Sequence, residues 1–197
     1  MNKVINYNYF HWGPFLYKTF MEQKEIEEIK NLCSKESKDY RATLAGLIKH
    51  EHVINVEKMF PFILPYVQSY IQAYSTYSTK PMGNKIELKA AWVNYMTKFE
   101  SNPLHTHDDD LSFVIYTDIP KNLKKEVESH VGNTKPGAIN FVYKLGNEKS
   151  GEINQHIFMP EVGDIFIFPA TLHHSVNHFQ SEGERVSISG NLKITNG

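Results

Sequence analysis

The spacing of hydrophobic residues changes along the chain, and it predicts helices in the first part and strands in the second. From Phe20 to about Ser37 the apolar residues recur at helical spacing, so this segment is expected to form an amphipathic helix. Thr19 and Glu22 have the spacing of a capping box at its start. The first predicted element is therefore a surface helix with one apolar face.

A second helical pattern runs from roughly Glu57 to Tyr77 and is rich in tyrosine. Pro61 and Pro65 are expected to delay or kink its first turns, because proline lacks the amide hydrogen that a helix uses. The tyrosines are expected to pack on a sheet. The polar segment Thr79 to Asn84 predicts a turn that ends the helical part.

The remaining pattern is typical of strands. Short runs rich in β-branched and aromatic residues are separated by Gly, Pro, Asn and Asp. Helices followed by antiparallel strands indicate an α+β, mainly β fold, a jelly roll with the N-terminal helices packed on the outside. The predicted strands are Ile86–Phe99, Leu111–Thr117, Ala138–Leu145, Gln155–Met159, Ile165–Phe168 and Glu184–Ile194.

Composition narrows the class of protein. At 197 residues one domain is expected, with a helical part over 1–84 and a jelly-roll core over 85–197. The 21 basic and 22 acidic residues are scattered, which argues against nucleic acid as a partner. Cys33 is the only cysteine, and no run of eighteen apolar residues occurs, so a cytoplasmic protein without a membrane span is expected. The polar stretch from Pro120 to Pro136 is predicted to be a surface insertion.

Candidate metal ligands lie just before one predicted strand. His105, His107 and Asp109 can share one face if the strand extends that far, because side chains alternate along a strand. A polar turn is the commoner explanation of such a motif when it occurs alone.

His174 follows the wholly apolar run Ile165 to Phe168 and Pro169, so it is expected at the mouth of a strand. The return geometry of a jelly roll can place it opposite the first cluster. Two histidines and one carboxylate form the facial site of non-haem Fe(II) oxygenases, which leaves positions open for a co-substrate and dioxygen.

The last predicted strand carries a candidate anion site. Arg185 and Ser187 fall on its polar face, eleven and thirteen residues beyond His174. An arginine pairs with a carboxylate through two parallel hydrogen bonds, and a serine on the same face can add a third, so this pair is a candidate dicarboxylate anchor. The alternative is an ordinary strand whose polar face meets water.

Taken together these motifs resemble those of the 2-oxoglutarate- and Fe(II)-dependent oxygenases found in bacteria and tailed phages, members of the prolyl-hydroxylase-like double-stranded β-helix (cupin-like) superfamily. The resemblance covers about residues 90 to 192, and the helical N-terminal third carries little of it. The residues that carry it are Trp92, Val93, Asn94, His105, Thr106, His107, Leu111–Tyr116, Gly163, Phe168, Pro169, His174–Val176, Glu184–Ser189 and Asn191.

The resemblance implies roles for individual residues. His174 would be the distal iron ligand, and Arg185 with Ser187 would bind the far carboxylate of 2-oxoglutarate. Tyr116 is expected near the same carboxylate, with Tyr95 as a weaker candidate.

The proximal ligands are either His107 with Asp109, the pattern of the wider superfamily, or His105 with His107, the pattern of this subfamily. We favour Asp109 over His105 here because an anionic ligand offsets the charge of Fe(II).

The resemblance also implies an activity. Fe(II), 2-oxoglutarate and O2 would be used to hydroxylate a C–H bond of a small molecule or a protein side chain, with succinate and CO2 as products, in the cytoplasm of the cell or of a phage host. Two alternatives stay open. A metal-dependent cupin that does not use 2-oxoglutarate is expected to leave Arg185 facing solvent, and a non-enzymatic jelly-roll binding module is expected to leave the histidines on the surface.

Overall fold

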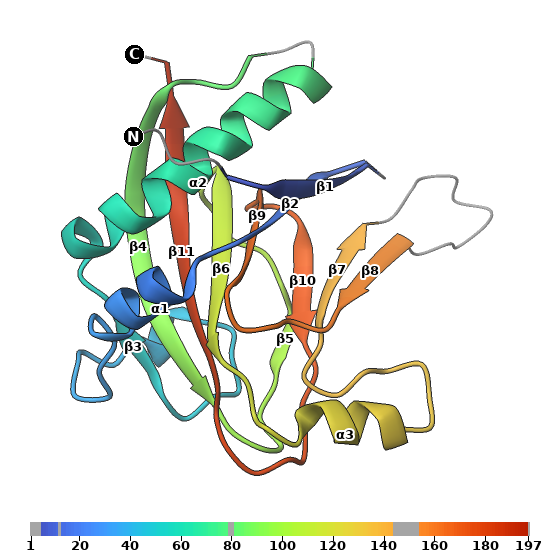
Figure 1. Ribbon diagram of the computed structural model, residues 1–197. Coiled ribbons are helices and arrows are strands. Elements are labelled where there is room, and N and C mark those ends of the chain that lie inside the picture. Colours follow the sequence, from blue (N-terminus) through green and yellow to red (C-terminus); the bar gives the residue numbers. More distant parts are fainter. Residues whose placement is uncertain (1–4, 12, 79–80, 144–153, 197) are drawn as a thin grey trace.

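Two antiparallel sheets face each other in the computed structural model, which describes residues 5–11, 13–78, 81–143 and 154–196 (Figure 1). The larger sheet has the order β1 (Tyr7–His11), β2 (Phe15–Phe20), β9 (Asp164–Pro169), β6 (Leu111–Asp118), β11 (Arg185–Thr195), β4 (Lys85–Met96) and β3 (Glu51–Val53). The smaller sheet has the order β5 (Asn102–His105), β10 (His173–Val176), β7 (Ile139–Tyr143) and β8 (Asn154–Phe158). This is the double-stranded β-helix that the sequence predicts.

The helices cover the outer face of the larger sheet. They are α1 (Gln23–Lys30) and α2 (Val56–Tyr77), while α3 (Leu123–Ser129) lies at one end of the molecule (Figure 1). Apolar side chains of α1 and α2 form one core with those on the outward face of β4, β6, β9 and β11. The tyrosines of α2 pack on the sheet as expected, since Tyr66 and Tyr70 are fully buried there.

Neither proline delays α2. The helix begins at Val56 and contains both Pro61 and Pro65. The Asn55 side chain accepts a hydrogen bond from the backbone N–H of Lys58 at 3.0 Å, which satisfies one of the amides that lack a partner in the first turn.

The predicted capping box before α1 is wrong. Thr19 belongs to β2, where it pairs with Ile165, and its hydroxyl donates to the backbone oxygen of Asn6. Glu22 caps the helix without a side-chain hydrogen bond, and α1 ends at Lys30, well before Ser37. Local spacing assigned Thr19 to the start of a helix, but pairing with the distant strand β9 places it in a strand.

The part of the chain before residue 85 is not only helical. It supplies β1 and β2, which extend the larger sheet beyond β9, and β3, which borders β4. The predicted turn at 79–84 lies partly outside the described residues, and residues 81–84 contain no helix or strand.

A short helix interrupts the predicted polar insertion. In α3 the side chain of Leu123 is buried, and the Glu126 carboxylate accepts hydrogen bonds from the backbone amides of Gln180 and Ser181, both at 2.8 Å. The lysines of this segment are exposed, as expected.

A second core fills one part of the space between the two sheets and leaves another part open. It contains Leu16, Val114, Tyr116, Ile139, Phe141, Phe166, Phe168 and Leu172. Next to it, the inward face of β4 and β11 carries mostly polar side chains, and these border a pocket. The fold therefore places a polar cavity beside an apolar wall.

Candidate metal and co-substrate site

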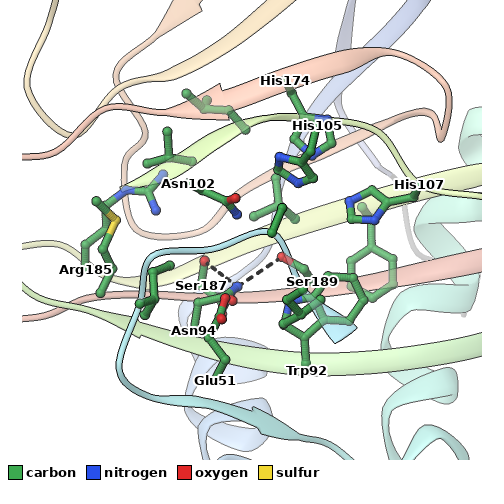
Figure 2. Close-up of a pocket in the computed structure, with 18 of the residues that line it drawn as sticks. Glu51, Trp92, Asn94, Asn102, His105, His107, His174, Arg185, Ser187 and Ser189 are labelled. Carbon is green, nitrogen blue, oxygen red and sulfur yellow. Dashed lines mark hydrogen bonds between the residues drawn. The ribbon is translucent and has the colours of Figure 1, made fainter. Parts of the chain in front are cut away.

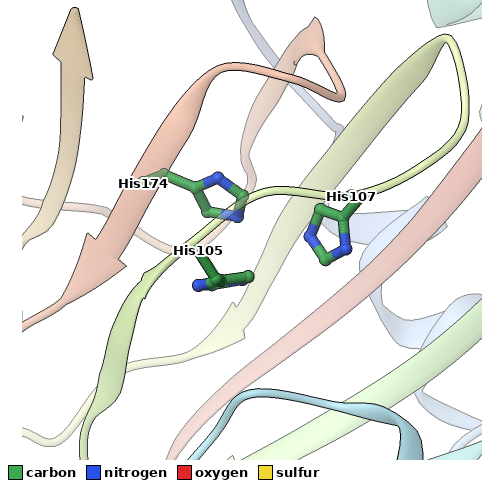
Figure 3. A group of neighbouring side chains, drawn as sticks. All are labelled: His105, His107 and His174. Carbon is green, nitrogen blue, oxygen red and sulfur yellow. The ribbon is translucent and has the colours of Figure 1, made fainter.

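Three histidines converge at the edge of the smaller sheet. His105 ends β5 and lies opposite His174 of β10 in the strand register, and His107 follows two residues later. The ring centroids are 4.2 Å apart for His105 and His174, 5.0 Å for His105 and His107, and 5.2 Å for His107 and His174. One ring nitrogen from each lies within 4.8 Å of the others (Figure 3). Three ring nitrogens this close together could hold one metal ion.

Backbone carbonyls orient two of the rings. Nδ1 of His174 is 2.9 Å from the oxygen of Leu172, and Nδ1 of His105 is 2.7 Å from the oxygen of Pro103. Each carbonyl favours the tautomer with the proton on Nδ1, which leaves the Nε2 lone pair available. Both histidines are therefore prepared to bind a metal through Nε2.

All three side chains are held in the neutral form. The pKa of His174 is lowered to about 3 and that of His107 to about 4. Burial is the main cause in both cases, and the neighbouring histidines contribute to the lowering. Burial also lowers the pKa of His105. Metal binding at neutral pH therefore needs no proton to be displaced from these rings.

Asp109 is not a member of this group. Strand β5 ends at His105 and residues 108–110 form a bend, so the alternation of side chains does not extend to Asp109. The next residue, Asp110, is bound to β11, where it accepts from the backbone N–H of Ile194 at 2.8 Å. The structure brings His105, and not Asp109, together with His107 and His174, and which of the two binds the metal stays a prediction.

Arg185 lies in the same pocket, at the start of β11 (Figure 2). Its side chain is only 2% exposed. One guanidinium nitrogen, Nη2, donates to the Tyr116 hydroxyl at 3.0 Å, and the guanidinium carbon lies 4.6 Å from the centre of the Tyr116 ring. Nε is buried without a hydrogen-bond partner, and no carboxylate pairs with this arginine among the described residues. A buried cation in this state is expected to bind an anion.

Polar residues on adjacent strands of the larger sheet lie between Arg185 and the histidines. In the register of the larger sheet Ser187 lies opposite both Asn94 of β4 and Tyr116 of β6. The Asn94 amide donates to the hydroxyls of Ser187 and Ser189, at 3.3 and 3.4 Å (Figure 2). Ser187 and Tyr116 thus lie on the pocket wall, as expected from the sequence.

Tyr95 does not share this pocket. It alternates to the other face of β4, where it lines a surface pocket with Lys30 and Cys33. Burial raises the pKa of the Cys33 thiol to about 12, so this cysteine is not a reactive thiolate.

Several residues that line the pocket were not singled out as site residues by the sequence. Trp92, Asn94 and Asn102 line the pocket, and so does Glu51 of β3, which is fully buried. No local motif marks Glu51, because its place beside Asn94 depends on the pairing of strands more than 40 residues apart.

Comparison with known families places these residues in context. The sequence model of the family described as "Putative 2OG-Fe(II) oxygenase" matches residues 90–191, more than half of the chain. The chain belongs to this 2OG-Fe(II) oxygenase family. All three histidines and Arg185 fall within the match, whereas Glu51 falls outside it. The comparison with curated proteins gives no match.

Solved structures confirm the fold of this 2OG-Fe(II) oxygenase. The viral collagen prolyl hydroxylase vCPH from Paramecium Bursaria Chlorella virus-1, in its 2OG complex, is 12% identical with a TM-score of 0.56, over 93% of this chain and 98% of that one. A Pseudomonas putida prolyl-4-hydroxylase is 14% identical with a TM-score of 0.56, over 91% and 92%. A 2OG-Fe(II) oxygenase family oxidoreductase from Burkholderia pseudomallei is 15% identical with a TM-score of 0.53, over 89% and 81%. No helix among the described residues is long and apolar enough to cross a membrane.

Proposed function

We propose that the protein is a dioxygenase that binds Fe(II) through His105, His107 and His174 and anchors 2-oxoglutarate through Arg185. The observation that carries the proposal is the buried guanidinium without an acidic partner, in the same pocket as three converging neutral histidines. Ser187 and Tyr116 flank the guanidinium and can add hydrogen bonds to the same carboxylate.

Each residue has a defined task in this proposal. When bound, Fe(II) with 2-oxoglutarate and O2 supplies oxidative decarboxylation to succinate and CO2, coupled to hydroxylation of a substrate C–H bond. Arg185 holds the far carboxylate, and Tyr116 holds Arg185 in turn through a hydrogen bond and its ring face. The apolar side chains of Val114, Ile139 and Phe168 line the same pocket and help to exclude water from it.

The two alternatives considered from the sequence fit the geometry less well. A cupin that does not use 2-oxoglutarate is expected to leave Arg185 facing solvent, and this side chain is buried. A binding module without catalysis is expected to leave the histidines on the surface, whereas His174 is only 6% exposed and His105 and His107 are half-buried.

Anaerobic titration with Fe(II) and 2-oxoglutarate tests the proposal. We expect a visible charge-transfer absorption band that needs both components, since a 2-oxo acid chelated to iron produces one. Arg185→Met keeps the length of the side chain but removes its charge, and it is expected to weaken 2-oxoglutarate binding by about 100-fold while Fe(II) binding stays unchanged.

Lys193→Met is the matched control, because Lys193 lies on the same strand but is exposed and paired with Asp110. Folded wild-type protein that gives no band, or Arg185→Met protein that gives the wild-type band at the same 2-oxoglutarate concentration, would contradict the proposal.

A further inference from the structure

Glu51 is a buried acid in the same pocket, and it has no role in the proposed binding of iron and 2-oxoglutarate. It begins β3 at the border of the larger sheet and lies opposite Asn94. Its exposure is 0%, and both carboxylate oxygens lack a hydrogen-bond partner. Figure 2 shows it beside Asn94, across the pocket from His105 and His174.

A loop passes over this carboxylate and lines the pocket beside it. A Cβ atom added at Gly46 would lie 2.6 Å from Oε1 of Glu51, so the glycine permits the loop backbone to pass directly over the acid. Leu44, Ala45 and Ile48 of the same loop line the pocket. The acid therefore lines the pocket and has no surface exposed to bulk water.

The chain supplies no cation to this acid among the described residues. Arg41 is the nearest candidate, but its guanidinium is exposed and bound to Asp39, with Nη2 and Oδ2 2.5 Å apart. Glu100 adds a second buried acid nearby, and its carboxylate is already used by the backbone amides of Lys49 and Thr97. Among the described residues, no group donates a hydrogen bond to the Glu51 carboxylate.

The pocket consequently contains two buried groups of opposite charge. Arg185 is a buried cation suited to the carboxylate of a co-substrate, and Glu51, opposite Asn94, is a buried acid with no hydrogen-bond partner. A carboxylate removed from water without a partner is costly, and an ammonium or guanidinium group that enters the pocket would offset that cost through charge-assisted hydrogen bonds.

We propose that Glu51 selects the substrate of this enzyme by binding a positively charged group on it, either a primary ammonium or a guanidinium. The inference rests on the proposed function, because it assigns the prime substrate to the space beside the iron and the co-substrate. The charged group belongs either to a free amine or to a lysine or arginine side chain of a peptide.

Binding of matched probes tests the role of Glu51 without any turnover. The protein is loaded anaerobically with Mn(II), with and without 2-oxoglutarate, and titrated with N-acetyl-lysine methylamide and its uncharged analogue N-acetyl-norleucine methylamide. Arginine and citrulline derivatives form the second pair, and free agmatine represents a small amine. Calorimetry and tryptophan fluorescence, to which Trp92 of the pocket contributes, report binding.

We expect the charged member of a pair to bind about 10- to 100-fold more tightly than the neutral one, with Glu51→Gln removing this preference. Preference for the capped amino acids would indicate a peptide, and preference for agmatine would indicate a small amine. Glu87→Gln is the control, because Glu87 is an exposed acid paired with Lys89. Glu51→Asp provides a second variant that keeps the charge.

Three results would overturn the role of Glu51. Charged and neutral probes could bind equally, protein that binds 2-oxoglutarate could bind no probe at all, or the preference for charged probes could persist in Glu51→Gln. The same holds if Glu51→Gln weakens Mn(II) or 2-oxoglutarate binding and leaves probe binding unchanged. Failure of the wild-type protein to bind 2-oxoglutarate would instead overturn the proposed function, so the two failures are distinguishable.

Discussion

At the scale of single residues, the pocket is defined by ionisable groups that are buried without an opposite charge. The sequence identified Arg185, because its strand has a clear polar face and His174 precedes it at a fixed interval. Glu51 escaped notice because it lies between two histidines in a segment without periodicity, and only the pairing of β3 with β4 brings it into the pocket. Local patterns identify residues on long strands better than residues on short ones.

The identity of the third metal ligand can be tested by exchanging the two candidates. His105→Ala is expected to weaken binding of Mn(II) by more than about 100-fold, because it removes one of the three converging nitrogens. Asp109→Ala is expected to change it by about threefold or less. Calorimetric titration with Mn(II) measures both, and the reverse order of effects would restore the ligand set with His107 and Asp109.

Titration of Glu51 gives a pH dependence of stability with a defined sign. Burial, followed by the charge of Glu100, raises the pKa of Glu51 from its ordinary 4.5 to about 7, although Arg41 lowers it slightly and Asp39 raises it slightly. Between these two pH values the unfolded chain has released the proton and the folded chain retains it. Stability therefore falls as the pH rises through this window, by up to about 3 kcal/mol, and is constant with respect to Glu51 below it.

The side chain introduced by Glu51→Gln cannot ionise. The free energy of unfolding of this variant, relative to that of the wild type, should therefore increase from about pH 5 to about pH 8. Urea unfolding of the metal-free proteins across this range measures the difference. Parallel stability curves for the two proteins would show that Glu51 has an ordinary pKa in the folded state.

At the scale of elements, the strands with strong apolar character were predicted well. β6, β9 and β11 begin and end within one or two residues of their predicted limits, because each is buried in the centre of the larger sheet. β1, β2, β3, β5 and β10 were not predicted as strands. Four of them are short, three to five residues, and carry exposed or polar side chains, so their conformation depends on distant partners and not on their own pattern. β2 is six residues long and mostly buried, and its conformation is fixed by its pairing with the distant strand β9.

The close approach of two central strands gives an element-scale prediction. A Cβ atom at Gly190 of β11 would lie 2.6 Å from the backbone oxygen of Ala90 and 2.5 Å from Cε1 of Phe113. Gly190→Ala should therefore destabilise the fold by about 1–3 kcal/mol, since a strand backbone must shift. Thr195→Ala, at the exposed end of the same strand, is expected to change stability by less than about 0.5 kcal/mol in the same chemical denaturation experiment. A Gly190→Ala protein as stable as the wild type would show that β4 and β11 can separate at no cost.

At the scale of the whole molecule, the division into a helical part and a jelly-roll part does not describe two separable pieces. The part before residue 85 supplies β2, which pairs with β9, and β3, which carries Glu51. It also supplies the helices that cover the outer core. The sequence predicted the helices from their period but did not reveal that the same region completes the sheet.

A fragment of residues 85–197 is accordingly expected not to fold on its own. Removal of the first part exposes the apolar outer face of the sheet and leaves the edges of β9 and β4 unpaired, which favours aggregation. Size-exclusion chromatography and circular dichroism of the expressed fragment check this expectation. A soluble, cooperatively unfolding fragment that binds Mn(II) would contradict it.

The border position of β3 has a consequence for how such an enzyme can be altered. His174 and Arg185 lie on strands that have a partner strand on each side, whereas Glu51 lies on a three-residue strand at the border of the larger sheet. Replacement of the segment from Leu44 to Val53 would thus exchange the group that meets the substrate while the interior sheet stays intact. Substrate preference in this architecture can be redesigned by grafting one peripheral segment, leaving the oxidative chemistry in place.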